Sequence, residues 1–147
     1  MSLGAGIVIE ERTFKASLKG EAFTLPTHIF VALLEVEPNH ALTGTELESG
    51  NYELNYEPYA RIEVPLAEWE FTAGTSSAKA KAVNKATITF ATPTVVTAKR
   101  HTAKFFAICD AVTAGNQFYT GSLASEQVAN VGGAVSIAAK ALEVSWE

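Results

Sequence analysis

Cysteine is the scarcest reactive residue in this chain of 147 residues, because Cys109 is the only one. A single thiol cannot form an internal disulfide, so we expect the stability of the fold to come from its core. The three histidines, His28, His40 and His101, are far apart and lack the short spacing of metal-ligand motifs. The sequence therefore predicts neither a disulfide nor a metal site.

Long apolar runs are also missing. The longest, IFVALL at 29–34, is far shorter than the ~20 residues that cross a bilayer. No charged start is followed by an apolar segment with a cleavage site, so we expect no signal peptide and synthesis in the cytoplasm. Membrane insertion is not expected.

Positive charge is sparse and dispersed. The chain has 11 Lys and Arg residues against 16 Asp and Glu, which gives a net charge of −5. Nucleic-acid binding usually needs a concentrated basic patch, and the nearest approach, AKRHTAK at 98–104, reads as a solvated loop before a strand. We therefore predict no nucleic-acid partner. With 48% hydrophobic residues, the length fits one domain over 1–147.

The usual signatures of catalysis are absent. There is no Gly-x-Ser-x-Gly elbow, and GAG at 4–6 lacks the preceding strand and the third glycine of a phosphate loop. Cys109 precedes Asp110, whose carboxylate would raise the pKa of a thiol rather than lower it. We predict that Cys109 is a buried core residue, so that its replacement by Ala or Ser leaves function intact. We predict no catalytic residues, no cofactor and no enzyme activity.

One short amphipathic helix is predicted at about 8–19. Phe14 and Leu18 are four residues apart and share a face, charged residues occupy the other faces, and Gly20 provides a stop. The simpler expectation is that Phe14 and Leu18 dock on their own domain; contact with another subunit is the alternative.

The rest of the chain, about 27–147, has the pattern of an all-β protein. A buried strand is predicted at 27–36, and strands with one apolar face at 59–65, 67–71, 86–91 and 141–147. This number of strands predicts an antiparallel two-sheet β-sandwich, jelly-roll-like, with one short N-terminal α-helix.

The alternation also assigns faces to individual side chains. In 59–65, Arg61 is expected on the face opposite Ile62, and in 67–71 Trp69 and Phe71 are expected to share the apolar face. In the last strand, the residues expected to point inward are Leu142, Val144 and Trp146.

A hairpin is predicted at 104–123. Phe106 and Ile108 would lie on one face of its first strand, and Ala107 and Cys109 on the other, so both faces are apolar. Such a strand is expected to be central, or covered by the helix or by a neighbouring subunit. Asp110 is expected to accept backbone N–H bonds two residues on, and Gly115 and Asn116 to supply positive φ angles at the turn.

The polar stretch at 37–58 is longer than an ordinary connection, so it is either a functional loop or contains short strands of its own. With the residues just after it, it holds three tyrosines that suggest a ligand-contact surface, because tyrosine gives large contact area at low entropic cost: Tyr52, Tyr56 and Tyr59. Its acidic residues would be the candidates for a carboxylate pair in a glycan hydrolase: Glu46, Glu48, Glu53 and Glu57.

Several segments in succession resemble a family of short phage tail fibre proteins. They are RTFKASLKGEAFTLPTHIFVALLEVEP, ESGNYELNYEPYARIEV, KATITFATPT, HTAKFFAICDAVTAGNQFYTGSL and NVGGAVSIAAKALEVSW. The likeness spans nearly the whole chain in order and spacing. It departs where Ala114 precedes Gly115 in place of two glycines, and where Gly133 replaces an aspartate.

The resemblance implies a non-enzymatic structural protein of a phage or prophage tail, in the fibre or its tip, localised to the virion. It further implies assembly as a homo-oligomer or with other tail proteins, and a role in host recognition. The alternative is a carbohydrate-binding module that recognises a bacterial surface glycan through the three tyrosines.

Overall fold

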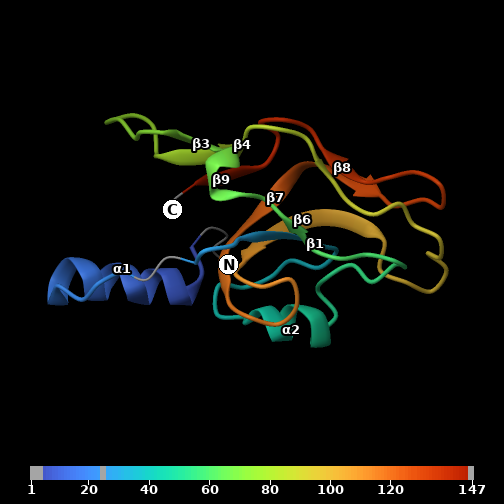
Figure 1. Ribbon diagram of the computed structural model, residues 1–147, viewed down its shortest axis with the longest axis horizontal. Helices are drawn as coiled ribbons and strands as arrows, with labels where there is room; N and C mark the ends of the chain where they lie inside the picture. The colour runs from blue at the N-terminus through green and yellow to red at the C-terminus, as the bar shows by residue number, and fades with distance from the viewer. Residues whose placement is uncertain (1–4, 24–25, 146–147) are drawn as a thin grey trace.

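The computed structural model describes residues 5–23 and 26–145. In these two ranges, two α-helices, one 3₁₀ turn and nine strands follow one another (Figure 1): α1 (Ile7–Lys19), β1 (Phe30–Leu34), α2 (Gly44–Ser49), β2 (Ile62–Glu63), η1 (Leu66–Glu68), β3 (Trp69–Thr72), β4 (Lys81–Asn84), β5 (Ile88–Thr89), β6 (Thr102–Cys109), β7 (Gln117–Val128), β8 (Ser136–Ile137) and β9 (Glu143–Ser145).

The largest sheet has four strands in the order β2-β1-β6-β7. Its register pairs Leu33 with Phe106 and Ala32 with Ala107, and every pairing in it is antiparallel. A three-stranded sheet, β3-β4-β9, and a two-stranded sheet, β5-β8, lie over one face of the large sheet (Figure 1). The predicted antiparallel β-sandwich with an N-terminal helix is confirmed.

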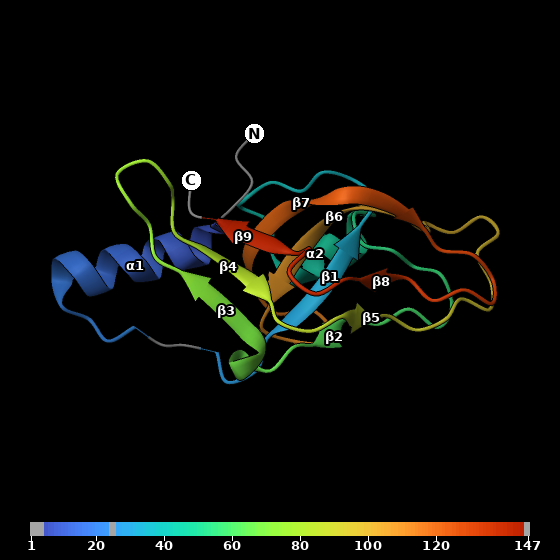
Figure 2. The ribbon, with the colours of Figure 1, turned by 90° about the horizontal axis from the view of Figure 1, so that it is seen from above.

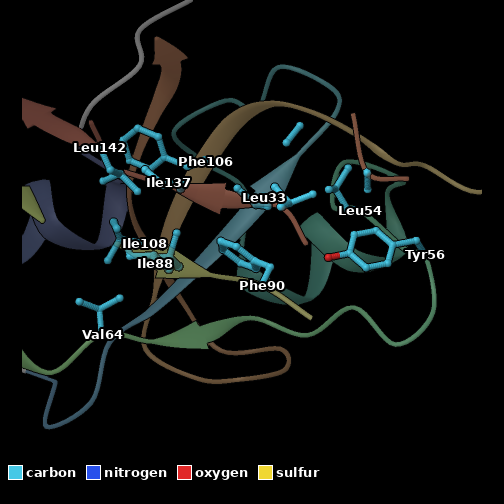
Figure 3. Close-up of a cluster of buried hydrophobic side chains, with 14 residues drawn as sticks. Leu33, Leu54, Tyr56, Val64, Ile88, Phe90, Phe106, Ile108, Ile137 and Leu142 are labelled. Atoms are coloured by element: carbon cyan, nitrogen blue, oxygen red, sulfur yellow. The ribbon is translucent and has the colours of Figure 1, made fainter. Parts of the chain in front are cut away.

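The main core lies between the large sheet and the smaller ones. Leu33 and Phe106 point into it from the large sheet, and Ile88, Phe90 and Ile137 come from the opposite layer (Figure 3). All five side chains are buried. Alternate residues of one strand point to one face of its sheet, and the period-two pattern of the sequence sorted Ile88, Phe90 and Phe106 correctly.

The other face of the large sheet is covered by α2 (Figure 1). Ala107 and Cys109 on that face pack in a second buried cluster with Leu47 of α2, and Tyr52 packs against the same cluster. The prediction that β6 has two apolar faces is therefore confirmed, and it is a central strand between β1 and β7. The cover of its second face comes from the same chain.

Several local details differ from the sequence-based expectation. The strand β4 and the helix α2 were not anticipated. At the hairpin turn, the positive φ angles belong to Ala114 and Gly115, and Asn116 has none. The predicted position of Trp146 lies outside the described residues. No helix in the described part of the chain is both long and apolar enough to span a membrane.

Candidate functional site

The helix α1 is attached to the sandwich only near its start. The backbone N–H of Gly6 donates to the carbonyl of Phe118, and that of Ile7 donates to the carbonyl of His40. Ile9 is buried, and the Arg12 guanidinium lies 5.2 Å from the centre of the Phe118 ring, a cation–π distance. These contacts fix the direction of the helix, and the rest of it projects from the body (Figures 1 and 2).

The projecting part carries an exposed apolar stripe. Phe14 is 63% exposed and Leu18 is 79% exposed, and Ile7 on the same side is also exposed. The expectation that Phe14 and Leu18 dock on their own domain is therefore wrong. At 3.6 residues per turn these three side chains lie within about 40° of one another, and Ile9 lies on roughly the opposite side of the helix. We call Ile7, Phe14 and Leu18 the ridge.

An apolar groove of about 360 Å³ opens at the base of α1. Ile9 forms part of one wall, together with Phe23 from the segment that follows the helix. The opposite wall comes from the sheet β3-β4-β9, which lies at the same end of the molecule as α1 (Figure 2). Its lining is almost wholly apolar. The end of the sandwich nearest α1 is thus left open.

Two aromatic side chains of β3 show how incomplete the cover of this groove is. Trp69 is only half-buried and Phe71 is 71% exposed, although the alternation assigns both to an apolar face. The Trp69 indole N–H is buried and has no hydrogen-bond partner among the described residues. A buried N–H without an acceptor is unfavourable in a monomer. This face therefore has the composition of a core and the exposure of a surface.

The other face of the large sheet, which α2 covers, is organised by a buried arginine. Arg61 is 3% exposed, and its Nε and Nη2 donate to the Glu53 carboxylate at 3.0 and 2.9 Å. Nη2 also donates to the carbonyl of Gly44, and Nη1 to the carbonyls of Ala111 and Ala114, all at 2.9 Å. One side chain thus ties α2, the 110–116 loop and the chain around Glu53 together.

A second carboxylate and a tyrosine complete this cluster. Glu48 of α2 lies 3.1 Å from Nη2 of Arg61 and accepts a hydrogen bond from the backbone N–H of Ala114. The Tyr59 hydroxyl donates to Glu53 at 2.7 Å and accepts from the backbone N–H of Leu33. We call Arg61, Glu53, Glu48 and Tyr59 the arginine cluster.

The charges of the cluster stabilise one another. Burial by itself would lower the pKa of Arg61, but the hydrogen bonds and charge of Glu53 raise it above its ordinary value. Burial, and then the charge of Glu53, raise the pKa of Tyr59 well above its usual range. The arginine therefore stays protonated and the tyrosine stays neutral near neutral pH, and both act as structural groups.

The sequence pattern had placed Arg61 on the face away from Ile62, where a charge would ordinarily meet solvent. It does lie on that face, but the chain around Glu53 and α2 covers it. A signal for α2 was present in the sequence. Thr43 and Glu46 have the spacing of a capping box, and in the structure each side chain bonds the backbone of the other.

The three tyrosines suggested as ligand contacts lie in different surroundings. Tyr56 is buried and donates its hydroxyl to the carbonyl of Ala91, and its ring meets that of Tyr59 edge to face. Tyr59 belongs to the arginine cluster. Tyr52 packs half-buried beside α2. Their role as ligand contacts stays a prediction. Of the three, Tyr52 and Tyr59 keep some exposed surface.

The four acidic residues considered for catalysis all have partners within the fold. Glu46 caps α2, and the backbone and hydroxyl of Thr43 lower its pKa. Glu48 and Glu53 bind Arg61, and Glu57 lies 3.8 Å from Lys99. A glycosidase needs one carboxyl whose pKa is raised, whereas the pKa of Glu46 is lowered.

Cys109 is buried in the cluster under α2, as predicted. Burial raises the pKa of its thiol to about 12, and the nearby Asp110 carboxylate contributes. Asp110 itself accepts from the backbone N–H of Asn116, six residues on rather than the predicted two. Within residues 5–23 and 26–145, no group of three His, Cys, Asp or Glu side chains could hold a metal ion.

Comparison with known proteins gives one family and no curated relative. No curated protein matches the chain. Residues 5–145 match the family described as Podophage GP4 fiber I protein gp80, which covers both α1 and the sheet that lines the groove. The ridge, the groove and the arginine cluster thus all lie in the matched region, and the chain belongs to this podophage fibre family.

Proposed function

We propose that the chain is a non-enzymatic structural subunit of a phage tail fibre, which assembles with itself or with other tail proteins. The family supports the tail fibre role and a place in the virion tail. The observation that carries assembly is the open apolar groove beside an exposed apolar ridge. Monomeric proteins rarely expose large apolar surfaces, and those that remain exposed commonly mark protein contacts.

The 46–58 stretch supports the same role in a different way. The carboxylates of the 46–58 stretch hold loops, cap a helix or pair with a lysine, which suits a rigid subunit rather than a hydrolase. A host glycan remains the alternative partner through Tyr52, Tyr56 and Tyr59. Binding to bacterial envelope polysaccharide that Tyr52→Ala abolishes would support that alternative.

Virion labelling tests the tail role directly. Antibodies raised against the purified chain should label the tails of intact particles in electron micrographs. Antibodies pre-absorbed with the same protein serve as the control. Particles whose tails stay unlabelled while their heads are decorated would contradict the proposal. In parallel, the purified chain should release no sugar from host envelope polysaccharide, and any release above a boiled sample would contradict the non-enzymatic role.

A further inference from the structure

The ridge on α1 cannot be covered by the groove of its own chain. Ile9 forms a wall of that groove, and the ridge lies on roughly the opposite side of the same helix. The hydrogen bonds of Gly6 and Ile7 and the packing of Ile9 fix the helix to the sandwich, so it cannot rotate to exchange these faces. The ridge and the groove are therefore both left without a partner inside one molecule.

We propose that the groove receives the ridge of a second copy of this chain, and that two copies exchange their helices reciprocally about a two-fold axis. This inference rests on the proposed assembly role and names its partner and surface. The groove supplies apolar walls and exposed aromatic side chains, and the ridge supplies Phe14 and Leu18 on a helix that already points away from its own body.

The amount of apolar surface fits a pair of copies. Five large side chains of the ridge and groove rim are about half or more exposed: Ile7, Phe14, Leu18, Leu66 and Phe71. Covering them removes on the order of 500 Å² per copy, because a buried aromatic side chain contributes roughly 150–250 Å². Reciprocal exchange doubles this to about 1,000 Å², the size at which specific interfaces begin. A one-way contact would bury only half as much.

Charge favours the same partner. The helix α1 carries three cations, Arg12, Lys15 and Lys19, against two carboxylates, whereas the whole chain has a net charge of −5. The net negative charge therefore lies outside α1. Placing α1 of one copy on the body of another brings opposite net charges together, where two bodies meeting directly would repel.

Oligomer mass and paired variants test the exchange. Light scattering of the full chain should give twice its mass of 15.6 kDa. Phe14→Asp and Phe71→Asp should each raise the dissociation constant about hundredfold or more, since each places a carboxylate in an apolar contact. The matched control is Val131→Asp, because Val131 is 62% exposed and lies between β7 and β8, away from α1. It should leave the dimer intact.

Disulfide trapping identifies the contact. Leu18→Cys and Phe71→Cys, purified separately and then mixed, should form a heterodimer cross-link on oxidation, whereas Val131→Cys mixed with Phe71→Cys should not. The native Cys109 is buried and does not compete. A chain that stays monomeric, a dimer that survives Phe14→Asp, or a small apolar molecule retained in the groove of a monomer by native mass spectrometry would each overturn the exchange.

These results separate the two proposals. Tail labelling together with a monomeric purified chain would leave the fibre role standing and assign the groove to another tail protein. A dimer that Phe14→Asp dissociates, together with unlabelled tails, would keep the exchange and remove the tail role.

Discussion

The two faces of the large sheet differ in how completely one chain covers them. On the face under α2, which holds the arginine cluster, charged and polar side chains are enclosed and each finds its partner within one chain. On the other face, beside α1, the groove and the ridge leave apolar side chains open, and the Trp69 N–H lacks an acceptor among the described residues. The first region is complete in a monomer, and we propose that association completes the second. On that proposal, the fold separates the surface that stabilises a subunit from the surface that joins subunits.

Breaking the arginine cluster should have the largest effect on the monomer. Arg61→Met leaves Glu53 buried without its partner and removes the bonds to three carbonyls, so we expect a loss of about 3–5 kcal/mol in the free energy of unfolding. Urea unfolding measures it. Lys104→Met, at an exposed position of β6, should change stability by less than about 0.5 kcal/mol.

A double variant shows whether the cost comes from the stranded carboxylate. Adding Glu53→Met to Arg61→Met should recover part of the loss, because the uncompensated buried charge is gone. If the double variant is less stable than Arg61→Met by the full cost of a second core substitution, the unpaired Glu53 carboxylate is not the cause of the loss in the single variant.

The same substitution at the two kinds of apolar site sharpens the contrast between core and ridge. Leu33→Ala, at a fully buried position, should cost about 2–5 kcal/mol, whereas Leu18→Ala, at a position 79% exposed, should cost less than about 0.5 kcal/mol in the dilute monomer. Urea unfolding at low protein concentration compares them. Comparable losses from both substitutions would mean that the ridge already serves its own domain.

A glycine beside the arginine cluster should tolerate no side chain. A Cβ on Gly44 would lie 1.9 Å from the carbonyl oxygen of Ala114, within the junction of α2 and the 110–116 loop. We expect Gly44→Ala to cost about 1–3 kcal/mol through this clash. Gly133→Ala is the control, because its Cβ would meet only one atom, at 3.8 Å. Similar thermal midpoints for the two variants would argue against tight packing at this junction.

The sequence was informative where a single periodicity decides the outcome. The faces of β6 followed from the alternation of Phe106 and Ile108 with Ala107 and Cys109, and the helix followed from the spacing of Phe14 and Leu18. Alternation gives the face of a residue but does not tell what covers that face. Arg61 was therefore expected near solvent and is buried, and Phe71 was expected in the core and is exposed.

The features that escaped prediction depend on contacts between distant segments. Arg61 is buried because α2 and the 110–116 loop, respectively 17 and about 50 residues away, close over it. The strand β4 has a weak pattern of its own and exists through pairing with β3 and β9. The groove is likewise a product of tertiary structure, since its walls come from α1 and from a sheet that begins 50 residues after α1 ends.

The smallest expected effect concerns the thiol under α2 and appears only at alkaline pH. Burial raises the pKa of Cys109 from 9.0 to about 12, so the folded protein holds this proton more tightly than the unfolded chain. The thiol's contribution to the free energy of unfolding is fully present below pH 9 and is lost as the pH rises from 9 towards 12, by about 1 kcal/mol at pH 10.

Cys109→Ala removes this group. The free energy of unfolding of the variant should therefore fall less steeply between pH 8 and pH 10 than that of the parent chain. Tyr59, whose pKa is also raised, is present in both proteins, so the difference between their urea unfolding energies isolates the thiol. Equal slopes for the two proteins, or rapid labelling of Cys109 by a thiol reagent in the native state, would show that the cover provided by α2 opens readily. The face of the large sheet under α2 would then be less closed than its hydrogen bonds indicate.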